Sequence, residues 1–182
     1  DNKTAMEVIS ELAAAQGAIV VPDRDADTLH IRHRYRQKGP WDYAAMDETE
    51  LDAILGDTQI TSYSSQWEPQ PAFNAVFVSG VSQGVAVEVQ RDGTPGDQPA
   101  DDIVDDLNVD TNQAKERGLT ALAESGNQEV VTIETLLPTS GAPGLVEPAM
   151  IVEVRDTIQP TETWRGNVLS TDIKVDTPGR GT

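Results

Sequence analysis

Apolar and polar positions alternate along residues 71–96, which read PAFNAVFVSGVSQGVAVEVQRDGTPG. A period of two is typical of strands, so the pattern predicts two amphipathic strands, one on each side of a glycine connection. Val81 to Gly84 joins them as a hairpin, and the glycines at 93 and 96 supply a turn. The segment carries no catalytic motif, which favours a structural or interaction role over an enzyme.

Apolar residues at helical spacing open the chain. Thr4 is the predicted N-cap, and Glu7, three residues later, completes a capping box. The apolar stripe of this helix consists of Met6, Ile9, Leu12 and Ala13. Gly17 is placed to end the helix, and residues 18–21 and 27–35 then predict two strands.

The next segment predicts one helix and one strand. The helix covers Asp47 to Leu55 and is ended by Gly56. Alternation over Ile60 to Trp67 predicts the strand. Pro69 and Pro71 follow it and mark the predicted domain boundary.

The second half begins with an acidic stretch. Residues 92–110 are rich in Asp, Gly and Pro, which predicts a solvated loop with one turn at Ile103 to Leu107. Thr111 caps the helix that follows, and Gly126 ends it. The remaining predicted elements are strands at 129–137, 150–155 and 163–175, with a Gly/Pro loop at 140–148.

These elements predict an α+β fold that is mainly β. Residues 1–70 form an α-β-β-α-β unit, and residues 71–176 form a small β-barrel with an inserted helix at about 111–125. Residues 177–182 form a flexible tail. The predicted core consists of Val76, Val78, Val85, Val87, Val131 and Ile133.

The chain has 182 residues, a formal net charge of −18 and no cysteine. The length suits one or two globular domains. The charge disfavours binding to nucleic acid or anionic lipid, and the missing cysteines exclude disulfides and thiolate sites. No apolar run is long enough for a membrane helix, and no secretion signal opens the chain. Because the chain begins on Asp1 and enters a helix at once, we expect a fragment of a longer protein.

One Asp-rich segment partly matches the sequence of an EF-hand calcium loop. Asp23, Asp25 and Asp27 have the spacing that opens an EF-hand loop, but Thr28 stands at position six and Arg34 at position twelve. That loop needs glycine and a bidentate glutamate at those positions. The pattern therefore predicts an acidic turn, and the later acidic loop also lacks a ligand spacing. We predict no metal site and no cofactor.

Residues for catalysis are scarce. The two histidines, His30 and His33, lie on opposite faces of one predicted strand, so they do not readily share a metal. Because the chain has no cysteine and no G-x-S-x-G turn, few residues are candidates for a catalytic nucleophile and its base. Acidic residues are so abundant that any glycosidase pair chosen from them is arbitrary. The glycines at 80, 84, 93 and 96 are turn residues, because no phosphate-binding G-K-[ST] sequence follows them. No catalytic residue is predicted.

Basic residues concentrate on one predicted strand face and its continuation, where Arg32, Arg34, Arg36 and Lys38 hold four of the thirteen basic side chains. Such a concentration fits an acidic partner, for example the 92–110 loop of a neighbouring copy. Internal ion pairs on a solvated face are the favoured explanation. The candidate interface residues are Arg32, Arg34, Arg36, Arg91, Arg117 and Trp164.

Several segments, taken in order, resemble the tail-hub (baseplate hub) proteins of bacteriophages and prophages, a family that includes the 43-kDa tail protein of Mu-like prophages. They are AAAQGAIVVPD at 13–23, TLHIRHRY at 28–35, the Gly39-Pro40-Trp41 break, FNAVFVSG at 73–80, GVAVEVQRDGTPGD at 84–97, AKERGLTALAESG at 114–126, LVEPAMIVEV at 145–154 and WRGNVLSTDIKV at 164–175. The resemblance covers nearly the whole chain and depends on the order of the segments, because none is a chemical signature.

The resemblance implies a structural, non-enzymatic component of a virion tail, assembled in the cytoplasm of a host bacterium. Hub proteins of this family form a trimeric ring of small β-barrel domains that joins the tail tube to the central spike or fibre. The implied partners are further copies of the chain and the tube, spike or fibre proteins, with no membrane and no specific nucleic acid. An acidic ring also suits the passage of DNA, which it would not retain.

Two alternatives stay open. A tail-associated glycan hydrolase would place a carboxylate pair in a concave pocket, with the pKa of one carboxyl raised. A carbohydrate- or calcium-binding module would act as a monomer and would use Trp41, Trp67 and Trp164 as stacking platforms or the Asp-rich loops as ligands.

Overall fold

The computed structural model describes residues 3–36, 38–81, 84–137, 144–155 and 163–174. The helices are α1 (Ala5–Ala15) and α2 (Thr111–Ala123), with short 3-10 helices η1 (Pro40–Ala45), η2 (Glu48–Glu50) and η3 (Asp57–Gln59). The strands are β1 (Ala18–Pro22), β2 (Leu29–His33), β3 (Ala53–Gly56), β4 (Ile60–Glu68), β5 (Ala75–Ser79), β6 (Ala86–Gln90), β7 (Ile103–Val104), β8 (Gln128–Thr135), β9 (Ile151–Arg155) and β10 (Trp164–Asn167). The predicted flexible tail at 177–182 lies outside the described residues.

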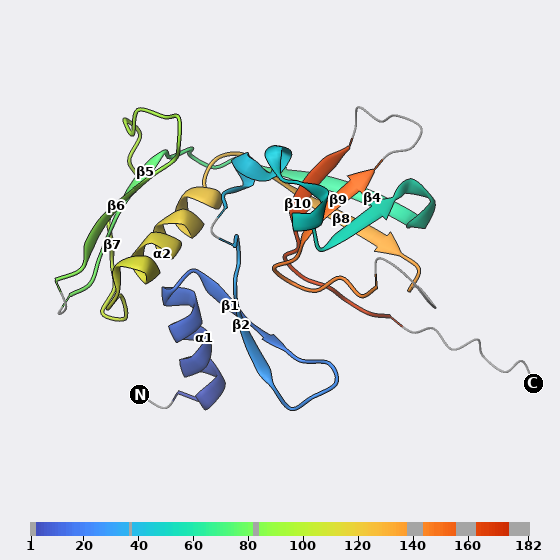
Figure 1. Cartoon of the computed structure of the whole chain (residues 1–182), viewed down its shortest axis with the longest axis horizontal. Coiled ribbons are helices and arrows are strands. Elements are labelled where there is room, and N and C mark those ends of the chain that lie inside the picture. The colour runs from blue at the N-terminus through green and yellow to red at the C-terminus, as the bar shows by residue number, and fades with distance from the viewer. Residues whose placement is uncertain (1–2, 37, 82–83, 138–143, 156–162, 175–182) are drawn as a thin grey trace, which may run out of the picture.

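Over the described residues the strands pair into four small sheets, in the orders β1-β2, β10-β9-β3, β4-β8 and β6-β5-β7. In Figure 1, α2 lies against the sheet β6-β5-β7 at one end, α1 accompanies the hairpin β1-β2, and the other two sheets lie at the opposite end. The fold is mainly β with two helices, which confirms the α+β class. The predicted barrel is not confirmed, because no sheet among the described residues closes on itself.

Strand pairing joins residues from both sides of the predicted boundary near residue 70. β3 pairs in parallel with β9, and β4 pairs antiparallel with β8. The division into units at 1–70 and 71–176 stays a prediction, but two of the four sheets take strands from both units.

Local signals fix both helix starts. The Glu7 amide donates to the Thr4 hydroxyl at 3.3 Å, and the Thr4 amide donates to the Glu7 carboxylate at 2.6 Å, so the predicted capping box of α1 is confirmed. The N-cap of α2 is Asp110 rather than Thr111. The Asp110 carboxylate accepts from the amide of Asn112 at 2.8 Å, and a carboxylate at this position also interacts well with the helix dipole.

Two glycines end the helices as predicted. Gly17, after α1, has φ +65°, and Gly126, after α2, has φ +81°. Gly17 also lies against α2, because an added Cβ would come within 2.4 Å of the Thr120 hydroxyl oxygen. The Thr120 hydroxyl donates to the Gly17 carbonyl at 3.3 Å. Gly17 therefore both ends α1 and allows the chain to pass close to α2.

The helix predicted over 47–55 is wrong. Residues 48–50 form the short helix η2, and residues 53–56 form β3. The reason is tertiary: β3 pairs with β9, and Asp52 exchanges hydrogen bonds with Ile151, donating from its amide at 2.9 Å and accepting at its carboxylate at 2.8 Å. These partners lie about a hundred residues away in the chain, beyond the reach of a local pattern.

The turn predicted at 103–107 is also displaced. Residues 103–104 form β7, which pairs in parallel with β5 at Val78 and Ser79. The turn follows at 105–108, where the Asn108 amide donates to the Asp105 carbonyl at 3.1 Å. The strand predicted over 163–175 covers only Trp164–Asn167.

The core has two parts, each on a three-stranded sheet. One lies between β5 and α2 and contains Val76, Val78, Ala114 and Leu122, with Val85 and Val87 packed beside it. At Gly118 the helix approaches the sheet so closely that an added Cβ would lie 2.5 Å from a methyl of Val89. The other part consists of Tyr35, Tyr43, Met46, Ala123 and Ile151. Burial raises the pKa of Tyr35 to about 12.

Three apolar patterns do not face this core. Met6 and Leu12 of the predicted α1 stripe are exposed, and the buried residues of α1 are Ala13 and Ala15. Val131 and Ile133, predicted as core, are only partly buried and belong to neither core cluster. Leu29 and Ile31 of β2 are exposed as well. The pattern identified these elements correctly, but within the part of the chain that the structure describes their apolar sides are only partly covered.

Candidate interaction surfaces

The basic side chains near β2 pair with carboxylates of the same chain. Arg32 donates to Glu147 at 2.9 Å, and Arg24 lies 3.7 Å from the same carboxylate. The other pairs are Arg34 with Glu124, Arg36 with Asp52 and Lys38 with Glu50. Internal ion pairs therefore account for this concentration of basic residues, as the sequence favoured. All these cations keep part of their surface exposed, so each pair is of small energetic value, and their role in an interface stays a prediction.

The other three candidate interface residues lie on separate elements. The guanidinium carbon of Arg91, after β6, lies 4.9 Å from the centre of the Trp41 ring, which is a cation–π contact. The Nε of Arg117, on α2, is buried without a hydrogen-bond partner among the described residues. Trp164 lies over Gly166 on β10, because an added Cβ there would be 3.0 Å from the indole Cζ3. Their part in an interface stays a prediction.

A buried ion network that the sequence did not reveal joins β9 and β10 to η1. Glu153 is 3% exposed and accepts from Arg165 at 2.7 Å and from Arg155. Arg165 also donates to the carbonyls of Tyr43 and Met46 at 2.7 and 2.6 Å. Burial alone raises the pKa of Glu153, but the hydrogen bonds from both arginines outweigh it and hold that pKa below its usual range. The feature of the sequence that could have indicated this network is the glutamate within the otherwise apolar run IVEV.

The Asp-rich segment forms a turn, as predicted. The Asp23 carboxylate accepts from the amides of Asp25 and Ala26 at 2.8 and 3.0 Å and lies 2.9 Å from the Nε2 of His30. The hydrogen bond with His30, followed by those from the backbone, lowers the pKa of Asp23. His33, on the opposite face of β2, lies 3.7 Å from Glu116 instead. The described residues contain no group of three or more His, Asp or Glu side chains that could hold a metal ion.

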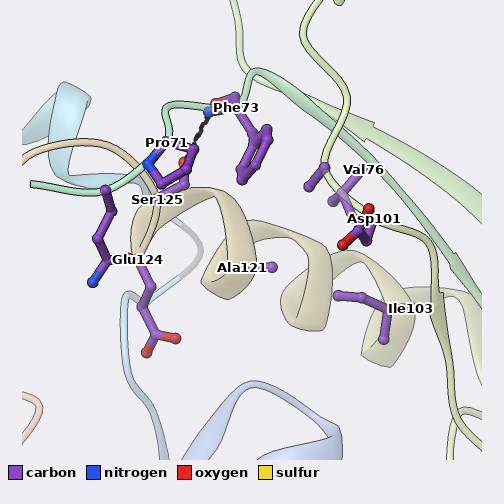
Figure 2. A pocket seen from close by; sticks show the side chains of 10 residues that line it. Pro71, Phe73, Val76, Asp101, Ile103, Ala121, Glu124 and Ser125 are labelled. Atoms are coloured by element: carbon purple, nitrogen blue, oxygen red, sulfur yellow. Dashed lines mark hydrogen bonds between the residues drawn. The ribbon is translucent and has the colours of Figure 1, made fainter.

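An open hollow lies between α2 and the segments that flank β5 and β7 (Figure 2). Phe73, Val76 and Ile103 give it an apolar wall. Its two carboxylates, Asp101 and Glu124, extend from opposite sides and do not converge (Figure 2). Glycoside hydrolysis needs two carboxyl groups that flank one bond, and Glu124 is engaged with Arg34. The hollow therefore offers no arrangement for the hydrolase alternative.

The strands β4 and β8 form an amphipathic ribbon with one apolar face. The register pairs Tyr63 with Ile133, Ser65 with Val131 and Trp67 with Glu129, which places these six side chains on the same face. The opposite face is formed mainly by Ser, Thr, Gln and Glu side chains. Trp67 is 63% exposed and Tyr63 is 51% exposed. The alternation in ITSYSSQW predicted the strand, but only the structure shows that its aromatic side chains face solvent.

The hairpin β1-β2 has a similar uncovered face. Its register pairs Val20 with Ile31 and Pro22 with Leu29, so these four side chains lie on one side. Ile31 is 59% exposed and Leu29 is 43% exposed. Large exposed apolar patches on soluble chains are typical of interaction sites. The two ribbons are therefore the candidate interaction surfaces of this protein.

No family model matches the sequence, and no curated protein matches it. Solved structures of tail proteins are similar to this one, and two of them are described here. The tail protein from Neisseria meningitidis MC58 matches with a TM-score of 0.51 and 18% identity, over 92% of this chain and 48% of that one. The 43 kDa tail protein of prophage MuSo2 from Shewanella oneidensis matches with a TM-score of 0.46 and 19% identity, over 87% of this chain and 44% of that one.

The first of these similarities shows the fold. The chain has the mainly β fold of a tail protein, in agreement with the resemblance read from the order of its segments. It spans about half the length of the tail proteins that it matches. Among the described residues, no helix has the length and apolar character needed to cross a membrane.

Proposed function

We propose that this chain is a structural component of a bacteriophage or prophage tail. The observation that carries the proposal is the match of 92% of the chain to the fold of the Neisseria meningitidis tail protein. The uncovered ribbons support an assembly role, because such faces are stable when a partner covers them. The described residues also lack convergent carboxylates in the hollow that a hydrolase would need.

Within the tail, we propose a place in a hub ring of three copies that joins the tube to a spike or fibre. The support is the collinear resemblance to hub proteins together with the two exposed apolar ribbons on each copy. The net charge of −18 suits a channel that DNA passes through without being held. Neutral or basic side chains along the inner wall of the ring would contradict this last point.

Two measurements test the proposal at its two levels. Peptide mass spectrometry of purified tail particles should detect the chain as a regular component, and particles that lack it would refute the structural role. Light scattering of the purified chain, and of a longer chain that includes its natural preceding residues, should give three times the mass of one copy. A monomer in both cases over a wide concentration range would refute the ring.

A further inference from the structure

We propose that residues 4–34, which contain α1, β1 and β2, form a unit that parts from α2 and moves as a rigid body while both cores stay intact. The inference goes beyond the tail role, because it concerns motion within one copy of the chain. Figure 1 shows the unit beside α2 and away from the sheets β10-β9-β3 and β4-β8. Such a change is a hinge movement, in which the packing inside each part is kept.

The unit has packing of its own. α1 packs against β1, and among the described strands β1 pairs only with β2. The buried apolar side chains of the unit are Ala13, Ala15, Ala18 and Val21. Among the described residues, neither core cluster includes a side chain from 4–34. The two apolar cores therefore do not hold the unit in place.

Side chains make the hydrogen bonds and ion pairs that join the unit to α2. No backbone-to-backbone hydrogen bond between described residues connects 4–34 with the rest of the chain. Three contacts come from positions 116, 120 and 124, which lie four residues apart on one stripe of α2. They are Glu116 with His33 at 3.7 Å, the Thr120 hydroxyl with the Gly17 carbonyl at 3.3 Å, and Glu124 with Arg34. We call these three contacts the polar seam.

Two further contacts reach the unit from outside α2. Glu147 accepts a hydrogen bond from Arg32 at 2.9 Å, and the Asn167 amide donates to the Arg34 carbonyl at 2.6 Å. Both contacts are polar as well. The unit is thus attached by contacts that water can replace, whereas the apolar faces of the cores cannot be exposed to water without a large cost.

The polar seam stabilises the docked arrangement only weakly. The side chains of Arg34 and Glu124 are 36% and 42% exposed, and ion pairs between such groups contribute little. The Glu116 carboxylate is more enclosed, and burial raises its pKa although the charge of His33 acts in the opposite direction. The cost of removing this carboxylate from water therefore exceeds the attraction of its partner. Parting from α2 returns Glu116 to water.

Gly17 lies at the centre of the polar seam. An added Cβ at this position would lie 2.4 Å from the Thr120 hydroxyl oxygen and 2.6 Å from the Glu116 carbonyl oxygen. The docked arrangement therefore needs a glycine here, apart from the positive φ that ends α1. A side chain at position 17 should shift the unit to the open arrangement.

Thiol labelling measures the open population, because the chain has no cysteine of its own. Thr120→Cys places a thiol in the polar seam, where the native residue is 6% exposed, and Val78→Cys places one in a core, at a position that is 0% exposed. Minor conformations are populated at about 0.1–10%, whereas complete unfolding exposes about one molecule in a thousand or fewer. The seam thiol should therefore react at least about tenfold faster than the core thiol.

Salt shows whether the polar seam is what opens. Sodium chloride at about 1 M shortens the Debye length to about 3 Å and screens the ion pairs of the seam. The seam thiol should then react at least about threefold faster, and Glu124→Gln should give a similar increase at low salt. The core thiol should respond to neither change. Equal rates for the two thiols, or a seam thiol that responds to neither change, would overturn the proposal.

A second measurement uses Gly17→Ala to favour the open arrangement, with Gly93→Ala as the matched control. Both glycines have positive φ, +65° and +74°, but nothing lies within 4 Å of an added Cβ at Gly93. Spin labels on Ser10→Cys, in α1, and Asn127→Cys, after α2, report the distance across the seam. This distance should become longer and more broadly distributed in the Gly17→Ala chain and stay the same in the control.

A label pair inside the unit separates rigid motion from unfolding. Ser10→Cys combined with Ala26→Cys, in the turn between β1 and β2, reports a distance that should be the same in the native, Gly17→Ala and Gly93→Ala chains. Two results would contradict the rigid movement: an unchanged distance across the seam in the Gly17→Ala chain, or a loss of the defined distance inside the unit. Neither result bears on the tail role, which mass spectrometry of tail particles tests separately.

Discussion

The two kinds of sheet in this protein differ in what covers them. In the three-stranded sheets the central strands β5 and β9 are largely buried, with Val76, Val78 and Ile151 fully shielded from solvent. The two-stranded ribbons β1-β2 and β4-β8 leave apolar side chains in solvent, Trp67 and Ile31 among them. Each of the larger sheets has a third strand that the ribbons lack, whereas a packed helix is not the difference, because α1 packs against β1 of the hairpin as well. The chain therefore builds its core on the three-stranded sheets and leaves an apolar face of each two-stranded ribbon exposed to solvent.

The largest effect on folding should come from the buried ion network. Glu153→Ala leaves Arg165 buried without its carboxylate, and breaking a buried pair in this way costs about 3–5 kcal/mol. Chemical denaturation followed by circular dichroism should show this loss of unfolding free energy. An unchanged midpoint would mean that the sheet β10-β9-β3 does not depend on the network.

The contact between α2 and its sheet should be next in size. Gly118→Val places methyl groups where Val89 already lies within 2.5 Å of an added Cβ, and overpacking of this kind costs about 1–3 kcal/mol. Thermal unfolding should show a clear drop in melting temperature. Gly56→Ala is the control, because an added Cβ there meets nothing closer than 3.9 Å. Equal melting temperatures for the two variants would contradict the close approach of the helix.

Protonation of Glu153 at low pH should also lower the unfolding free energy, by a smaller amount than the Glu153→Ala substitution does. The folded pKa of Glu153 is lowered from a reference of 4.5, so its contribution is complete above the pKa of the unfolded chain and is lost as the pH falls through the folded pKa. Unfolding free energy should therefore decrease as the pH is lowered from about 5. The Glu153→Gln variant should show a shallower decrease in the same titration. Parallel curves for the two proteins would show that other carboxyls dominate the acid response.

The smallest effect should be found on the ribbon. Trp67→Ser changes a side chain that the chain itself barely covers, so the unfolding free energy of the monomer should shift by no more than about 0.5 kcal/mol. Denaturation at a concentration where the chain is monomeric measures this. A loss comparable to that of Gly118→Val would show that the ribbon belongs to the core and would remove the contrast between the two kinds of sheet.

Much of the local structure could be predicted from the sequence. The capping box at Thr4 and Glu7, the helix ends at Gly17 and Gly126 and most of the strands follow from signals within a few residues of each other. The acidic turn at Asp23 and the placement of His30 and His33 on opposite faces follow likewise. The physical reason is that capping hydrogen bonds, positive φ and alternation act over a single turn or strand.

The candidate surfaces could be predicted only in part. Alternation located the strands that contain Trp67 and Ile31, but the same alternation assigned Val131 and Ile133 to a core. Alternation with a period of two indicates that a strand has an apolar face. It does not indicate whether other parts of the same chain cover that face. The sequence showed that basic residues concentrate near β2. It did not show that Glu147, Glu124 and Asp52 are their ion-pair partners.

The sequence by itself determined the two α-helices, most strands and turns, the strong negative charge and the absence of thiol chemistry. The tertiary structure alone decided that residues 53–56 extend along β9 instead of forming a helix, that β4 pairs with β8, and that Glu153 lies between two arginines. Each of these outcomes depends on partners that lie far apart in the chain or on how a strand packs. Local propensity cannot encode such contacts, because the free energy that fixes them is gained only when the distant segments meet.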